Sequence, residues 1–577
     1  MRAVKAKTIA YFLLFAVLVA YITSSFQINA NASERGGILR SDAAGYYLWL
    51  PAVLIYDDSD YEFCDSSFTA GGFYPSGYFD YMLKSTDNGR RINKYGPGAA
   101  ISALPFFTLA HLYGSLIGEN VGTETHYQWS WWIASTFYVC LGFVSLFLLG
   151  QFRGRNAFFS LAVVSSLLFG TNVFHYATFD AGMSHAFTFG WLGLALLLSD
   201  RIRQVAAKKH WLLLGLACAM VVLIRPFNVV MLPVIFVALP LKRLVDAAVR
   251  KQFVLAGLMF ILFLLIWPAS NYWQTGDFLV YGYGEEQFNF SKPHFWQFFV
   301  GFEIGAFVYS PLILLMILVA GFASYRLQRL WFYVLFLAWF FLVVWVLSCW
   351  ESWQYGCTLG NRPLSDWYVF FAAVILMWDV SRERRWFITT ITVIAALLLT
   401  YSQVVHYQYR HWIIDWCHMT KQEFMDVFLK TDSDYMFYCS GAWDYSKTDN
   451  NVTLRDTILT PVKRVCAKKH LDLAAFSNIG MSAKTNHRIL ITAEARFPER
   501  RGNTKFAVYV GQEEKYFDYR QKFIKKEVHE TQLWQPFRFE FHTRHTEEPI
   551  DVAVALIDGV DDCVEVRNIQ IQWIGYD

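Results

Sequence analysis

The residues of this sequence best suited to chemistry are carboxylates and cations that stand beside glycine, proline and aromatic residues. Asp42 is the single carboxylate of the segment Arg40-Ser-Asp-Ala-Ala-Gly-Tyr-Tyr-Leu-Trp-Leu-Pro51 and precedes an aromatic stretch. A carboxylate in such a place can act as a general base that takes the proton of an attacking hydroxyl. Standing alone, the same pattern more often marks an ordinary loop with the aspartate as a helix N-cap.

A cation beside a turn follows in Asn93-Lys-Tyr-Gly-Pro-Gly98. A glycine- and proline-containing turn exposes backbone N–H groups, and a lysine beside them suits a phosphate. Lys94 and Tyr95 are therefore candidate substrate-binding residues. For Lys94 the alternative, equally good on sequence alone, is snorkelling to lipid headgroups.

Two further stretches carry polar residues between apolar ones. Asp180 and His185 stand in Phe179-Asp-Ala-Gly-Met-Ser-His-Ala186, although a lone histidine at a helix start is more often structural than catalytic. The longer stretch Asn271–Phe302 adds, among aromatic residues and glycines, Glu285, Glu286, Lys292 and His294. The two glutamates are reserve candidates for the base, and the other residues are candidates for substrate binding.

A tryptophan-rich segment, Cys349–Pro363, contains Trp350, Glu351 and Arg362. Flat tryptophan faces stack on sugars, but they also form the aromatic belt of membrane proteins, which is the safer interpretation for any one of them. Arg362 enters the next apolar run and is a candidate ligand of a lipid-linked phosphate, as is Arg225 at the end of an earlier run.

Composition places these motifs in a membrane protein. Of 577 residues, 55% are hydrophobic and only 17% are charged, whereas soluble proteins carry about 25% charged residues. The net charge of +3 is too small to indicate nucleic-acid binding. Eleven apolar runs bounded by charges predict membrane-spanning helices at 8–26, 129–150, 157–174, 183–199, 211–224, 227–241, 253–271, 305–323, 330–348, 365–380 and 386–404. The first run is read as a retained anchor rather than a cleaved signal peptide.

Orientation follows from the basic residues. If Pro97–Ile117 is a membrane-surface or re-entrant segment, the basic residues of 2–7, 153–155, 201–209, 242–251, 326–329 and 382–385 all lie on one side. The positive-inside rule then predicts a cytoplasmic N-terminus and an external C-terminus. The external segments are 27–128, 175–182, 272–304, 349–364 and the region after 405, and they hold the candidate motifs.

The predicted spans carry little charge, with only His185 and Arg225 near their outer ends. Ion-coupled transporters usually bind their ions with charged or polar residues at mid-membrane. This pattern therefore favours an enzyme that works at the outer interface. A lipid or polysaccharide transporter and a non-catalytic glycan-binding membrane protein remain the alternatives.

A water-soluble domain is predicted at 435–577, after a linker at 406–434. Apolar residues alternate with polar ones at 489–495, 506–510, 537–541, 552–556 and 569–573, which predicts strands of a β-sandwich or jelly roll. Such domains resemble carbohydrate-binding modules, and a structural lid is the alternative. Seven of the nine cysteines fall outside the membrane in this topology, where disulfides are permitted.

Together the motifs resemble the GT-C superfamily of integral-membrane glycosyltransferases, whose bacterial members include aminoarabinose transferases and protein O-mannosyltransferase-like enzymes. The similar segments, within roughly residues 1–405, are Ser-Asp-Ala-Ala-Gly-Tyr-Tyr at 41–47, Lys-Tyr-Gly-Pro-Gly at 94–98, Met-Ser-His-Ala at 183–186, Leu-Ile-Arg-Pro at 223–226, Phe-Val-Tyr-Ser-Pro at 307–311 and the Asn-Arg-Pro loop. One difference is that Ala43 follows Asp42 where mannosyltransferases of the superfamily carry a paired Asp-Glu.

The resemblance implies an α-helical polytopic membrane protein of the bacterial cytoplasmic membrane with an external active site. It implies a polyprenyl-phosphate-linked sugar as donor and a glycan, lipid or protein as acceptor. Asp42 would be the base of an inverting displacement, with Lys94, Arg225 and Arg362 on the phosphate. A divalent cation held by carboxylates of separate loops stays open, since no ligand spacing specifies a metal site.

Overall fold

The computed structural model describes residues 2–30, 37–71, 73–74, 77–86, 88–205, 207–237, 239–240, 244–284, 286–416 and 419–432, and in the C-terminal region 451–459, 463–466, 470–479, 486–498, 505–512, 515–524, 528, 532–543, 550–557 and 563–576. The chain divides into two units. The first unites residues 1–68 with 77–406 and the second unites residues 69–76 with 407–577.

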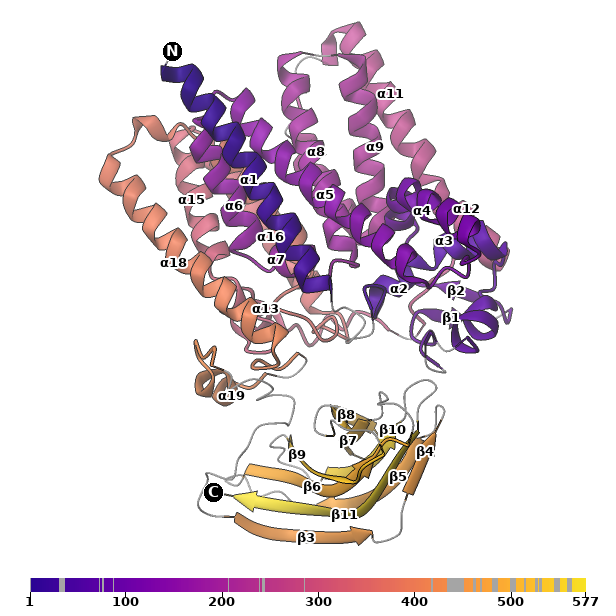
Figure 1. The fold of residues 1–577 in the computed structure, drawn as a ribbon. Helices are drawn as coiled ribbons and strands as arrows, with labels where there is room; N and C mark the ends of the chain where they lie inside the picture. Colours follow the sequence, from indigo (N-terminus) through magenta and orange to yellow (C-terminus); the bar gives the residue numbers. More distant parts are fainter. Residues whose placement is uncertain are drawn as a thin grey trace. The chain divides into compact units, whose positions relative to one another are not determined.

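The first part of the chain is helical (Figure 1). Its α-helices are α1 (Arg2–Ala30), α2 (Asp42–Tyr47), α3 (Trp49–Pro51), α4 (Gly98–Ile117), α5 (Thr125–Phe152), α6 (Ala157–Phe169), α7 (Val173–Ala177), α8 (Ser184–Gln204), α9 (Lys208–Ile224), α10 (Leu232–Val237), α11 (Ala247–Leu264), α12 (Ile266–Thr275), α13 (Phe295–Val300), α14 (Ala306–Tyr309), α15 (Leu312–Arg326), α16 (Leu330–Ser348), α17 (Tyr368–Leu376) and α18 (Arg385–Arg410). Tighter or wider helical turns are η2 (Ala52–Tyr56), η3 (Cys64–Thr69), η4 (Pro226–Met231), η6 (Ser365–Trp367) and η7 (Val380–Arg382), and β1 (Leu83–Ser85) pairs with β2 (Arg91–Asn93) in an antiparallel hairpin.

Among the described residues, six helices are long and apolar enough to cross a membrane: Thr8–Ala30, Gly98–Ile117, Thr125–Phe152, Ala247–Thr275, Leu330–Ser348 and Arg385–Arg410. Four shorter apolar helices accompany them, at Ala157–Phe169, Pro226–Val237, Leu312–Arg326 and Ser365–Leu376. This is the helix content expected of the polytopic protein that the composition predicts. Each of the eleven predicted runs contains a helix, while the number of helices that cross the membrane stays a prediction.

One of the six helices, α4, coincides with the segment assigned from sequence to the membrane surface. It runs without a break over 20 residues despite Pro105, so length and apolarity alone do not separate it from a span. Whether α4 crosses the membrane decides on which side of the membrane every later loop lies.

Reporter fusions test on which side these loops lie. A fusion after Arg203 should report the cytoplasm and a fusion after Asp577 the outside, because that topology collects the basic loops on one side. If α4 crosses the membrane, both signals are reversed. Equal signals from the two fusions would contradict the predicted topology in either form.

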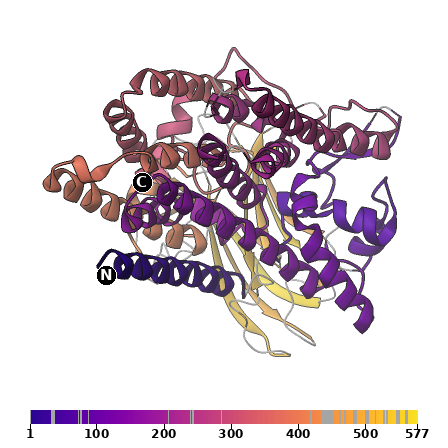
Figure 2. The same cartoon turned by 90° about the horizontal axis from the view of Figure 1, so that it is seen from above.

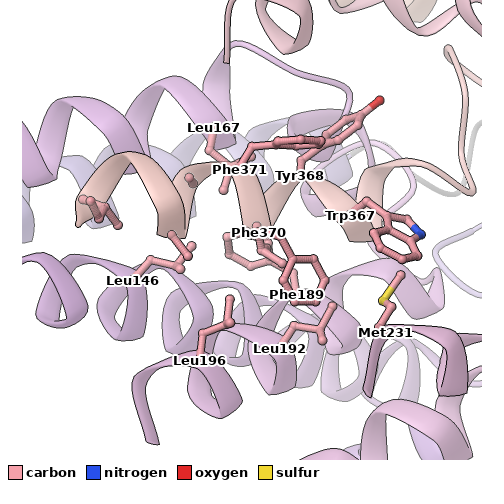
Figure 3. Close-up of a cluster of buried hydrophobic side chains, with 14 of the residues drawn as sticks. Leu146, Leu167, Phe189, Leu192, Leu196, Met231, Trp367, Tyr368, Phe370 and Phe371 are labelled. Carbon is pink, nitrogen blue, oxygen red and sulfur yellow. The ribbon is translucent and has the colours of Figure 1, made fainter. Parts of the chain in front are cut away.

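The helical unit is centred on α17, which is buried around nearly its whole circumference between α5, α6, α8 and α15. Figure 3 shows Phe370 and Phe371 of this helix, with Trp367 just before it, among leucine side chains of the neighbouring helices. Helices α5, α8 and α9 lie side by side (Figure 1), and α1 lies at the edge of the unit when seen from above (Figure 2). A helix buried on all sides is expected at the centre of a bundle.

Close approach between α5 and α8 depends on glycine. A Cβ added to Gly193 would lie 2.8 Å from the Cα of Gly142 on the facing helix. Small residues at such a contact let two helix backbones approach each other closely. The contact fixes α8, whose first turn carries His185.

The C-terminal region consists of two antiparallel sheets. Its strands are β3 (Asn451–Leu459), β4 (Lys463–Cys466), β5 (His470–Ile479), β6 (Asn486–Arg496), β7 (Lys505–Gln512), β8 (Lys515–Phe523), β9 (Gln535–Thr543), β10 (Ile550–Ile557) and β11 (Cys563–Tyr576), and the helix α19 (Lys421–Asp426) precedes them. One sheet has the order β5-β10-β7-β8, and the other has the order β3-β11-β6-β9 with β4 also paired to β11. All five segments with predicted alternation lie in strands. Buried Ile491 and Ala493 of β6, and Ile569 and Ile571 of β11, show the expected period of two.

Candidate active site

Asp42 is the first residue of α2 and follows a residue with unusual backbone geometry. Ser41 has φ 52° and ψ −141°, a region that residues other than glycine rarely adopt. Its amide donates a hydrogen bond to the Tyr78 hydroxyl at 2.7 Å. Strained residues of this kind persist where surrounding contacts hold them, and they cluster at functional sites.

Side chains, not helix N–H groups, bind the Asp42 carboxylate. Its Oδ2 accepts a hydrogen bond from Nη1 of Arg362 at 2.7 Å, and its Oδ1 accepts one from the Tyr95 hydroxyl at 2.6 Å. The side chains of Arg362 and Asp42 are only 14% and 16% exposed. The helix-cap alternative therefore does not describe what this carboxylate does.

The charge state of Asp42 follows from these contacts. Burial alone would raise the pKa of its carboxyl, but Arg362, the Tyr95 hydroxyl and Lys94 outweigh burial and hold the pKa below its ordinary value. The same pair holds the pKa of the Arg362 guanidinium above its ordinary value, although burial opposes this. Asp42 is thus an ionised proton acceptor at neutral pH.

A second ion pair fixes the backbone just before Asp42. Nη2 of Arg40 lies 2.6 Å from Oδ1 of Asp180, and Nε2 of His175 lies 2.9 Å from Oδ2 of the same carboxylate. The Arg40 guanidinium also lies over the Phe179 ring at 4.7 Å. Both oxygens of Asp180, expected from sequence to bind substrate, thus bond within the protein and attach the 40–42 turn to the segment before α8.

The Lys94 side chain is surrounded by aromatic rings and lies close to Asp42. Its ammonium is 3.5 Å from the Glu286 carboxylate, and the side chain is only 11% exposed. It lies 5.4–5.8 Å from the ring centroids of Tyr81, Tyr95 and Tyr283. Glu286 is therefore the partner of Lys94, and Glu285 lies outside the described residues.

A third cluster centres on Asp366, a residue that sequence reasoning missed. Its Oδ1 lies 2.8 Å from Nδ1 of His185, and its Oδ2 lies 3.2 Å from Nη1 of Arg225. The Ser365 hydroxyl is 3.2 Å from the same nitrogen of His185. The signal was present in the sequence, because a carboxylate inside a predicted span is a functional candidate by default.

Three of these groups, those of Asp42, Lys94 and Asp366, meet around tyrosine side chains. Tyr46 interacts electrostatically with Asp42, Arg225 and Arg362, and Tyr283 interacts with Asp42, Arg225 and Glu286. Lys94 and Arg362 thus act on Asp42 directly, and Arg225 shares the neighbours Tyr46 and Tyr283 with it. Sequence reasoning missed both tyrosines, as well as Arg40 and Tyr176, whose ring packs on His185.

The remaining candidates lie at the margin of this region. Trp350 packs edge-on against Phe288 and Tyr283, with ring centroids 4.8 and 5.6 Å apart. His294 stacks on Trp353 at 4.5 Å. Glu351 and Lys292 are exposed. Trp350 thus borders the aromatic rings around Lys94 through its contact with Tyr283.

The part of the chain that the structure describes contains no ready-made set of metal ligands. No group of three or more His, Cys, Asp or Glu side chains is placed there to hold an ion. The acidic residues of the site are each committed to a cation of the protein itself: Asp42 to Arg362, Glu286 to Lys94, and Asp366 to Arg225.

The fold and the site define a helical protein with several helices able to span a membrane and a half-buried cluster of paired charges. Comparison with protein-family models and with characterised proteins finds no match to this chain. Assignment of the function therefore rests on the residues of the site.

Proposed function

We propose that this protein is a membrane glycosyltransferase that moves a sugar from a polyprenyl-phosphate carrier to an extracytoplasmic glycan, lipid or protein. The observation that carries the proposal is the cluster just described, in which one ionised carboxylate, Asp42, lies beside Arg362 and Lys94 and shares the neighbour Tyr46 with Arg225. A base beside a set of cations is what transfer from a phosphate leaving group requires.

The reaction is a single displacement with inversion. Asp42 takes the proton of the acceptor hydroxyl while the oxygen attacks the anomeric carbon. The bond between that carbon and the phosphate oxygen breaks, and its electron pair leaves with the lipid phosphate. Lys94, Arg225 and Arg362 neutralise the charge that develops on this leaving group.

The proposed architecture is GT-C-like, with about eleven spans and an external C-terminal β-sandwich, in the cytoplasmic membrane of a bacterium. Support comes from the six long apolar helices and the two antiparallel sheets. Cys357, in the predicted external segment 349–364, is disulfide-bonded. Disulfides persist in oxidising compartments outside the cytoplasm, which agrees with this orientation.

Donor capture provides the test of this function. Lys94→Ala and Arg362→Ala should each raise the apparent KM for the donor roughly ten- to a hundred-fold, because a charge-assisted contact contributes about 1.5–3 kcal/mol. The measurement is transfer of labelled sugar from polyprenyl-phosphate donors by the purified protein in detergent.

Arg91→Ala is the matched control for this test. Arg91 lies in the same predicted external segment as Lys94 and is paired with Asp65 at 2.8 Å, but Asp65 is 66% exposed. Its removal should leave the donor titration unchanged. If the Lys94 and Arg362 variants also titrate like the wild type, these cations do not bind the donor phosphate.

A further inference from the structure

Arg362 has one role in the proposed function and a different partner in the structure. In the proposed function it binds the donor phosphate, whereas in the structure its guanidinium is paired with Asp42 at 2.7 Å. The second oxygen of Asp42 is occupied by the Tyr95 hydroxyl at 2.6 Å. Both oxygens of the proposed base are therefore engaged before any substrate binds.

We propose that the donor phosphate and Asp42 compete for Arg362, so that donor binding releases Asp42 to act as the base. This inference rests on the proposed function and adds an order to it. The donor binds first, and the acceptor hydroxyl meets a free carboxylate oxygen only afterwards.

Asp42 and Arg362 differ in how firmly the structure holds them. Asp42 is held by the Tyr95 hydrogen bond and follows the fixed turn at Ser41. Arg362 lies in a turn outside any helix, between the left-handed Gly360 and η6. Asp42 keeps its contact with Tyr95 when Arg362 leaves, so the exchange is assigned to Arg362.

The chemistry of the competitors favours exchange when the donor arrives. A guanidinium offers five N–H donors in a planar fork that matches phosphate oxygens as well as carboxylate oxygens. Only one of its nitrogens, Nη1, is described as bonded to Asp42. The other two site cations are less suited to switching, since Arg225 is paired with the nearly inaccessible Asp366 and the Lys94 ammonium presents a point charge rather than a fork.

Binding of farnesyl phosphate to the full-length protein in detergent tests the competition without an acceptor. Asp42→Asn should lower its dissociation constant about ten-fold, because Arg362 loses a charged competitor. In an Arg362→Gln background the same Asp42→Asn change should have no effect. In an Arg362→Lys background, which keeps the charge, it should again tighten binding.

The double-mutant cycle separates competition from simple electrostatics. Asp65→Asn is the control, because it removes the carboxylate that pairs with Arg91 in the predicted external segment that also contains Asp42. It should leave the dissociation constant for farnesyl phosphate unchanged. An equal gain from Asp42→Asn in the wild-type and Arg362→Gln backgrounds would overturn the competition and leave the proposed function standing. The competition would also be overturned if the Asp42→Asn variant bound farnesyl phosphate no tighter than the wild type. A wild-type protein that fails to bind farnesyl phosphate at all would overturn the proposed function and this inference with it.

Discussion

Asp42→Asn is expected to slow sugar transfer at least about a hundred-fold while the protein still folds and binds donor. Asparagine keeps the shape and can still accept the Tyr95 hydrogen bond, which measures 2.6 Å in the structure, but it has no basic oxygen. General-base catalysis is typically worth about 10²–10⁴-fold in rate. The measurement is turnover of labelled polyprenyl-phosphate sugar by purified wild type and variant.

The pH profile of the wild type is a second test of the same assignment. Arg362, Tyr95 and Lys94 overcome the effect of burial and hold the pKa of Asp42 below its ordinary value of 3.8. Because the pKa is lowered, the carboxylate stays ionised as the pH falls, and kcat/KM should decline only below that value. The asparagine variant should show no such decline.

Glu286→Gln is the comparison variant, since Glu286 is the described reserve candidate for the base. Its carboxylate lies 3.5 Å from the Lys94 ammonium, so its loss should change donor affinity more than turnover. If Asp42→Asn keeps near-normal turnover while Glu286→Gln or Glu285→Gln abolishes it, the base belongs to the 272–304 segment.

Asp366→Ala is expected to destabilise the helical unit by about 3–5 kcal/mol. The carboxylate is 3% exposed and binds both His185 and Arg225. Its removal leaves Arg225, whose side chain is 18% exposed, without its counter-charge, and removing one partner is the costly way to break a largely buried pair. The measurement is the unfolding temperature of the purified protein in detergent.

Two variants calibrate the Asp366 result. Asp366→Asn keeps hydrogen-bonding capacity toward His185 and should lower the unfolding temperature less. Asp379→Ala removes a 38% exposed carboxylate that pairs with Arg155, and a surface pair of this kind contributes at most about 1 kcal/mol. If Asp366→Ala is no more harmful than Asp379→Ala, the Asp366 cluster does not stabilise the fold.

The sequence alone determined the elements of this protein. The apolar run 330–348 coincides with α16 (Leu330–Ser348), and the alternation at 489–495 lies within β6 (Asn486–Arg496). The first prediction succeeds because an uninterrupted apolar run of this length favours a helix. The second succeeds because a half-buried strand alternates apolar and polar residues. The sequence also singled out Asp42, Lys94, Arg225 and Arg362, since charged residues beside glycines and aromatics are conspicuous in an apolar chain.

Only the tertiary structure decided which of these residues meet. Asp42 and Arg362 are 320 positions apart in the sequence, and His185 and Asp366 are 181 apart. No local pattern encodes such pairs, because they depend on how α8 and the segments around α17 pack against each other. The same packing engages Asp180 with Arg40 and commits Glu286 to Lys94. Residue types and their sequence neighbours indicate which chemistry is available. The packing of distant segments determines which carboxylate pairs with which cation.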